Sequence, residues 1–190
     1  MDDYSNEDKP VSMFSQAEHD EDAQAILLCP DEDFIKKVEM SISKLLPTME
    51  REQIIKTSLK NRGALILTQD IDDAVKISNR IAPEHLELCV ADPDALAAQI
   101  THAGAIFLGA WTPEAIGDYV GGPNHVLPTA RSARFSSGLS VMDFIKRTTL
   151  TKMTPAALGL IGPAAERLAL SESLEAHSLS VTARLTKLNR

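Results

Sequence analysis

The fold is decided by residues 64–81, which read ALILTQDIDDAVKISNRI. The stretch opens on a short, nearly continuous apolar run, which is typical of a strand buried on both faces. Asp70 follows at the position of a helix cap, and apolar residues then recur at the spacing of a helix that packs along one face. The stretch therefore predicts one strand-helix unit, with a strand at 64–68 and a helix at 71–81.

The same alternation extends in both directions. It predicts strands at 24–29 and 103–108, and a proline-bearing turn that leads into a strand at 82–90. It also predicts helices at about 50–61 and at 93–100, and one that ends at 46 and is capped by Asp31. A further helix opens at Thr112-Pro113-Glu114, with Thr112 as its cap. Strands that alternate with helices of this length indicate βαβ units and a parallel sheet. The expected fold class is α/β, a mostly parallel sheet with flanking helices in an incomplete Rossmann-like arrangement, over residues 15–130.

Both ends of the chain depart from this pattern. The first ten residues, MDDYSNEDKP, are polar and acidic, and we expect residues 1–14 to be disordered or irregular. After a polar, basic bridge at 131–138, the periodicity from Ser140 onward is helical only. Residues 131–190 are therefore predicted to form a small all-helical C-terminal tail of three short helices, the first at about 141–148. Such a tail cannot bury its apolar stripes alone. We therefore expect it to pack on the sheet domain or on a partner subunit.

Composition excludes several classes of protein. The 190 residues are 44% hydrophobic and 24% charged, as in an ordinary globular protein, and the formal net charge of −8 without a basic cluster argues against nucleic-acid binding. No apolar run approaches the roughly 20 residues of a membrane helix, and the acidic N-terminus does not resemble a signal peptide, so a cytoplasmic location is expected. Cys29 and Cys89 lie in apolar runs without metal-site spacing, which indicates inert buried thiols.

Residues 117–129, GDYVGGPNHVLPT, carry the clearest chemical signal. Three glycines and two prolines predict a shaped loop whose backbone can approach a ligand. Asp118 and His125 add a carboxylate and an imidazole, which can bind a metal or transfer protons. A turn with a capping aspartate and a solvated histidine explains the same residues equally well.

Three other pairs carry weaker signals. Gln16 and His19 are three apart, and would share one face of a helix as half of a metal site. Glu84 and His85 precede a strand at the edge of the sheet, and Glu172 and His177 are five apart in the tail. Taken one at a time, each pair is explained more simply by solvated surface groups.

Together and in this order, four segments resemble histidinol dehydrogenase: SQAEH (15–19), IAPEHLEL (81–88), residues 117–129, and EAHSLSVTARL (175–185). The resemblance runs from about Ser15 to the end of the chain. It implies a zinc-dependent, NAD-linked enzyme of histidine biosynthesis, which oxidises L-histidinol through the aldehyde to L-histidine in two hydride transfers.

The resemblance also implies roles for eight residues, all at the substrate site. Zinc would be held by Gln16, His19, Asp118 and His177; the acid-base pair would be Glu84 and His85; the substrate would be held by His125 and Glu172. His85 is the natural base for the alcohol, and Glu84 can activate the water that hydrates the aldehyde. In this family the tail reaches into the neighbouring subunit, so Glu172 and His177 would complete the partner's site in a homodimer.

The N-terminal part of the family, with its nicotinamide contacts, has no counterpart in this sequence, and no GxGxxG is present. We therefore expect the C-terminal part of the enzyme, without cofactor-binding residues of its own and inactive unless a separate N-terminal half completes it. The alternative is a non-catalytic relic, or a zinc- or imidazole-binding module of the same fold. A related zinc- and NAD-dependent alcohol dehydrogenase is a third hypothesis, because the absent half would build part of the substrate pocket.

Overall fold

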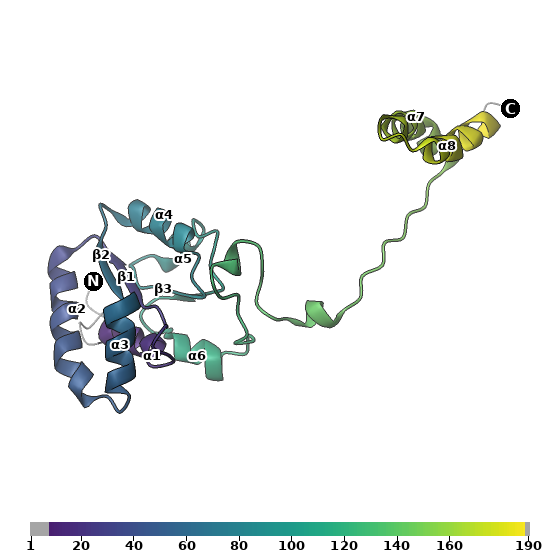
Figure 1. Ribbon diagram of the computed structural model, residues 1–190. Coiled ribbons are helices and arrows are strands. Elements are labelled where there is room, and N and C mark those ends of the chain that lie inside the picture. The colour runs from purple at the N-terminus through teal and green to yellow at the C-terminus, as the bar shows by residue number, and fades with distance from the viewer. Residues whose placement is uncertain (1–7, 189–190) are drawn as a thin grey trace. The chain divides into compact units, whose positions relative to one another are not determined.

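The computed structural model describes residues 8–188 (Figure 1). The chain divides into two compact units after Phe144, and each unit is described by itself. Within the described residues, no helix has both the length and the apolar character needed to cross a membrane.

The described residues of the first unit include four short strands. β1 (Ile26–Cys29) pairs with β2 (Ala64–Leu67), and β3 (His85–Leu88) pairs with β4 (Ala105–Leu108), each pair in parallel. The described strands thus form two two-stranded parallel sheets, with Ile26 opposite Ala64 and His85 opposite Ala105. The α/β class and the parallel pairing are confirmed.

Helices alternate with these strands as the sequence predicts. They are α1 (Asp8–Ala17), α2 (Glu32–Leu45), α3 (Glu52–Arg62), α4 (Ile71–Ile81), α5 (Pro93–Ala97) and α6 (Glu114–Tyr119), with 3₁₀ turns at Leu46–Thr48, Ser132–Arg134 and Val141–Phe144. The cap at Asp70 is confirmed, because its carboxylate accepts from the Asp73 N–H at 2.7 Å. The cap at Thr112 is wrong: Thr112 donates its hydroxyl to the Leu108 carbonyl at 2.8 Å, and Pro113 stands at the N-cap of α6.

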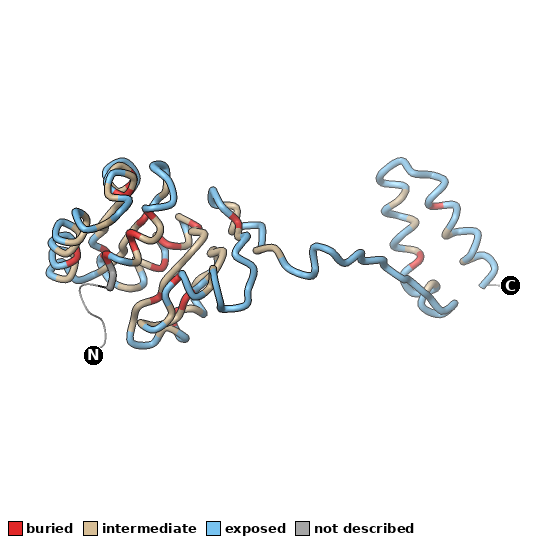
Figure 2. The backbone as a smooth tube through the Cα atoms, turned by 90° about the horizontal axis from the view of Figure 1, so that it is seen from below, coloured by how far each residue is buried: buried red, intermediate tan, exposed pale blue. Residues whose placement is uncertain are grey.

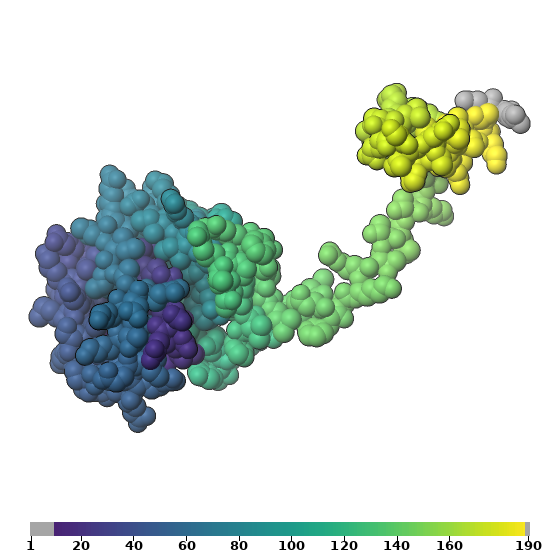
Figure 3. All heavy atoms as spheres, viewed as in Figure 1, coloured from purple at the N-terminus to yellow at the C-terminus, as the bar shows by residue number. Residues whose placement is uncertain are grey.

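The expected irregular N-terminus differs from the structure at residues 8–14, which belong to α1, whereas residues 1–7 lie outside the described part. The reason is burial. Phe14 and Ala17 pack in a core cluster with Ile55 of α3, and Met13 packs with Val38 of α2. Burying Phe14 and Met13 stabilises the helix by about 1.5–3 kcal/mol each, and Figure 3 shows α1 beside α3 on the surface of this unit.

The strands are less covered than two-sided burial predicts. Leu67 of β2 is 53% exposed and Ile106 of β4 is 37% exposed, although the other strand residues are buried or half-buried. Figure 2 shows short buried stretches of this unit separated by intermediate and exposed ones. The described helices therefore leave part of each sheet uncovered.

The first unit extends beyond residue 130, where the sequence predicted its end. The guanidinium groups of Arg131 and Arg134 both donate to the Arg80 carbonyl, near the C-terminus of α4. The Leu139 N–H donates to the Val126 carbonyl at 2.9 Å. These bonds attach the segment after residue 130 to the sheet domain. The helix expected at about 141–148 is only the 3₁₀ turn Val141–Phe144, because every residue from 140 to 157 is exposed and a short helix without packing is marginal.

The second unit is a helical hairpin of α7 (Pro155–Ser171) and α8 (Glu175–Leu188). Thr154 caps α7 by accepting from the Ala157 N–H at 3.1 Å. The helices approach closely at Gly162, where a Cβ would lie 3.2 Å from Val181 and Leu185 of α8. Several large apolar side chains stay exposed: Leu160, Ile161, Leu168, Leu170, Leu174 and Leu179.

Candidate active site and metal cluster

His85 is the centre of the candidate site in the first unit. It is the first residue of β3, and its side chain is only 13% exposed. The imidazole lies beside Phe107 of β4, with ring centroids 6.1 Å apart. Because the strand fixes its backbone and Phe107 packs on its ring, the imidazole is held in one place.

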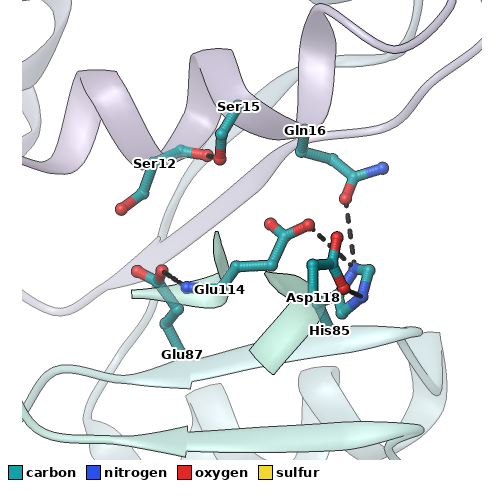
Figure 4. Close-up of polar contacts among 7 residues, drawn as sticks. All are labelled: Ser12, Ser15, Gln16, His85, Glu87, Glu114 and Asp118. Carbon is teal, nitrogen blue, oxygen red and sulfur yellow. Dashed lines mark hydrogen bonds and ion pairs between the residues drawn. The ribbon is translucent and has the colours of Figure 1, made fainter. Parts of the chain in front are cut away.

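Polar side chains from two helices converge on this ring (Figure 4). Nδ1 is 3.3 Å from Gln16 Oε1 of α1 and 3.3 Å from Glu114 Oε1 of α6. Nε2 is 3.8 Å from Asp118 Oδ1, which is too long for a hydrogen bond. Nε2 is also buried, and no described residue forms a hydrogen bond with it. We call Gln16, His85, Glu114 and Asp118 the His85 cluster.

Helix α6 delivers two carboxylates to the cluster. Glu114 and Asp118 are four residues apart, so they project from one helical face. The N-terminus of α6 is anchored because the Glu114 N–H donates to Glu87 Oε1 of β3 at 3.1 Å. A glycine at 117 allows the helix to lie against β4, since a Cβ there would be 2.5 Å from Phe107 Cε1.

The acidic surroundings alter the chemistry of Glu114. Burial first, and then the negative charges of Asp118, Glu87 and Glu84, raise the pKa of Glu114 to about 7. The carboxyl is therefore poised to change its charge near neutral pH. Titrating groups with shifted pKa values in a buried cluster are typical of functional sites.

The cluster also has the donor chemistry of a divalent-metal site. One nitrogen of His85 and one oxygen each of Glu114 and Asp118 lie within 4.8 Å of one another. Imidazole and oxygen ligands without thiolate suit zinc. The residues at this site therefore fit the zinc ion that the resemblance implies.

The expected ligand set is brought together only in part. Gln16 and Asp118 both approach the His85 ring. The helical turn that Gln16 and His19 would share is not formed, because α1 ends at Ala17, and His19 lies exposed after it, as a solvated helix end predicts. His177 lies in the second unit, and is described there.

Two other expected residues flank the cluster in sequence. Glu84 is half-buried directly before β3, and its carbonyl accepts from the Ala105 N–H at 2.8 Å. His125 is exposed. The loop that carries His125 is shorter than the glycines and prolines of residues 117–129 predict, because 117–119 form the last turn of α6.

In the second unit, Glu172 and His177 line one hollow of about 360 Å³. Its other walls are mainly apolar side chains of α7 and α8, including Leu168 and Val181. Both polar residues are exposed at this surface. The hairpin therefore presents a carboxylate and an imidazole together, on a surface with exposed leucines.

Sequence reasoning missed Glu114 and Glu87 as members of the site. In the sequence Glu114 only helps to open the helix after Thr112, yet its four-residue spacing from Asp118 places both on one face. Glu87 is two residues after His85 in the strand, so both side chains point to the same face. These two spacings were the signals that could have found them.

Comparison with known proteins gives concordant matches. The family model described as histidinol dehydrogenase matches residues 5–185. Histidinol dehydrogenases of Cereibacter sphaeroides and Ruegeria pomeroyi are 68% and 66% identical over 179 residues, which is 94% of this chain and 41% of each relative. The crystal structure of histidinol dehydrogenase from Elizabethkingia anophelis matches with a TM-score of 0.87 at 38% identity, covering 98% of this chain and 43% of that chain. The chain thus spans less than half the length of these relatives.

Proposed function

The chain belongs to the histidinol dehydrogenase family, and on that basis we propose that it supplies the C-terminal part of an NAD-linked enzyme that oxidises L-histidinol through histidinal to L-histidine in the cytoplasm. The observation that carries the proposal is the environment of His85. Its buried Nε2 has no hydrogen-bond partner among the described residues, while carboxylates and an amide surround the ring. This is the arrangement that a proton-accepting imidazole needs.

The residues of this chain would handle the protons of the reaction. His85 Nε2 would take the proton of the substrate alcohol as the first hydride leaves. Glu84, which directly precedes His85, would activate the water that hydrates the aldehyde before the second hydride leaves. NAD would accept both hydrides, and no residue of this chain is assigned to it.

The other expected residues would bind and orient the substrate. Zinc, held by Gln16, His19, Asp118 and His177, would orient the imidazole and amine of histidinol. His125 and Glu172 would hold the substrate directly. This assignment gives each of the eight residues one role, and leaves Glu114 and Glu87 as groups of the site without one.

We further propose that Glu172 and His177 act in the site of a second copy of the chain, in a homodimer with exchanged tails. The support is the apolar surface of the hairpin, where Leu160 is 82% exposed and Leu168 is 65% exposed. Monomeric proteins rarely expose so many neighbouring apolar side chains. A second copy would bury them.

Complementation tests the proposed activity. The chain alone is expected to give no histidinol-dependent NADH, and activity is expected when the chain is combined with the N-terminal part of the Cereibacter sphaeroides relative that it does not match. His85→Gln should then lower kcat about 10²–10⁴-fold. His102→Gln is the matched control, because the backbone N–H of His102 donates to Asn79 and its side chain lies outside the cluster.

Two results would contradict the proposal. Turnover by the chain alone would show that the N-terminal part is not needed. A folded complex that binds zinc and NAD but does not oxidise histidinol would favour the non-catalytic binding module.

A further inference from the structure

We propose that Glu114 is a positioning residue, which holds the His85 imidazole in the tautomer that carries its hydrogen on Nδ1 and so leaves the lone pair on Nε2. The purpose of this tautomer rests on the proposed function, since Nε2 is the atom that would take the proton of the alcohol. The tautomer itself is a property of this chain, and it can be measured without activity.

Two side-chain oxygens lie near Nδ1 of His85. A neutral imidazole carries one hydrogen, on either nitrogen. The Gln16 amide oxygen accepts a hydrogen bond from Nδ1 if the hydrogen is there, and the Glu114 carboxylate oxygen lies at the same distance of 3.3 Å. A lone pair on Nδ1 would face both oxygens and be repelled. The contacts therefore favour hydrogen on Nδ1.

Glu114, not Gln16, decides which nitrogen of the His85 ring carries the hydrogen. The Gln16 amide can turn to present its NH₂ group, so it can serve either tautomer. The Glu114 side chain is 9% exposed, and at a pH well above 7, where its carboxyl is ionised, it has no hydrogen to donate. Its orientation is fixed as well, because Glu87 anchors the first N–H of α6 and the helix packs on Phe107 at Gly117.

Asp118 acts in the opposite sense, because its carboxylate would attract a hydrogen on Nε2. It is the weaker influence for two reasons. Its oxygen is 3.8 Å from Nε2, beyond hydrogen-bond distance, and its side chain is 20% exposed, so solvent screens it more than it screens Glu114. In the proposed enzyme Asp118 also contributes its oxygen to zinc.

One proton moves in the proposed step. The hydroxyl proton of the substrate moves to Nε2, and the ring becomes an imidazolium with hydrogens on both nitrogens. Glu114 remains ionised and faces the Nδ1 hydrogen, so it stabilises the new charge and receives no proton. Glu114 therefore acts through His85 and does not touch the substrate.

NMR of the full chain labelled with ¹⁵N in the imidazole rings tests the inference, in the presence of a chelator and at a pH well above 7. The chain has five histidines, and a His85→Gln spectrum assigns the His85 signals. We expect Nδ1–H to be favoured about tenfold or more in the wild type, as a carboxylate at this distance implies. Glu114→Gln should reduce that preference about tenfold, because an amide can serve either tautomer.

The matched control is Glu87→Gln. It alters the neighbouring carboxylate in the same way, but its amide oxygen still accepts from the Glu114 N–H and it does not touch His85. Its His85 tautomer should equal that of the wild type. The backbone amide spectrum of each variant verifies folding, and if Glu114→Gln does not fold, the wild-type tautomer decides.

A wild-type ring with hydrogen on Nε2, alone or together with Nδ1, would overturn the inference, as would an unchanged tautomer in folded Glu114→Gln. The proposed function fails by a different result. A complex that does not oxidise histidinol while His85 carries its hydrogen on Nδ1 contradicts the function alone. An active complex with His85 in the other tautomer contradicts this inference alone.

Discussion

Replacing Gly117 by alanine should destabilise α6 and disturb the His85 cluster. The added Cβ would lie 2.5 Å from Phe107 Cε1 and 2.9 Å from Cζ, whereas carbon atoms in contact prefer about 3.5–4.0 Å. Either the helix or the ring must therefore move by about 1 Å. Phe107 is itself buried at the cluster, so the ring cannot turn away into solvent.

The expected cost follows from two opposing terms. Overpacking of a buried contact costs about 1–3 kcal/mol, and alanine gains about 1 kcal/mol over glycine within a helix. Together the two terms lower the stability of α6 by up to about 2 kcal/mol. A shift of about 1 Å in Glu114 and Asp118 should also lower kcat of the complemented enzyme by about 10²-fold.

Hydrogen exchange resolved by segment measures this effect, and Gly159→Ala is the control. Gly159 lies inside α7, and an added Cβ there would point into open space. The same substitution should therefore slow amide exchange in α7, with a gain of about 0.5–1 kcal/mol in the free energy of opening. Equal protection gains in α6 and α7 would refute the close contact between Gly117 and Phe107.

Three further predictions concern the same unit. Because the pKa of Glu114 is raised from 4.5 to about 7, the folded chain binds the proton more tightly than the unfolded chain. The free energy of unfolding should therefore fall by up to about 3 kcal/mol as pH rises from about 4.5 to 7. Glu114→Gln should lose this pH dependence in urea titrations at several pH values, and an unchanged dependence would contradict the prediction. Glu87→Ala should weaken the start of α6 by about 0.5–2 kcal/mol, seen as faster amide exchange there and not in α4, and unchanged exchange would disprove the anchor. Phe14→Ala should destabilise the first unit by about 3–5 kcal/mol in urea unfolding, and a cost below 1 kcal/mol would mean that α1 is not part of the core.

Most of the α/β fold could be predicted from the sequence, because local patterns decide it. The apolar run before Asp70 and the stripe after it gave a strand, a cap and a helix that the structure confirms. Errors arose where tertiary contacts override local signals. The acidic start of the chain does not reveal that Phe14 will pack against Ile55, so α1 was missed over 8–14. The end of the first unit was misplaced because bonds from Arg131 and Arg134 to Arg80 join residues far apart in the chain.

The site could be predicted by residue type but not by geometry. Asp118 and His85 carry recognisable motifs, and the structure brings their side chains together. Glu114 is part of the same cluster, yet nothing in its local sequence shows that α6 will pack against β3 and β4. The contact of Glu114 with His85 spans 29 residues of chain, and the contact of His85 with Gln16 spans 69, so only folding creates them. Long-range polar clusters of this kind are what a pattern along the chain cannot display.

The most direct test of the account is the zinc content of the purified chain, measured together with its oligomeric state in the wild type, in His177→Ala and in the control His102→Ala. We expect one zinc per chain in a dimer, lost in His177→Ala and kept in His102→Ala. Zinc that is retained in His177→Ala, or a folded wild-type chain that binds none, would contradict the proposed ligand set and the exchanged tail.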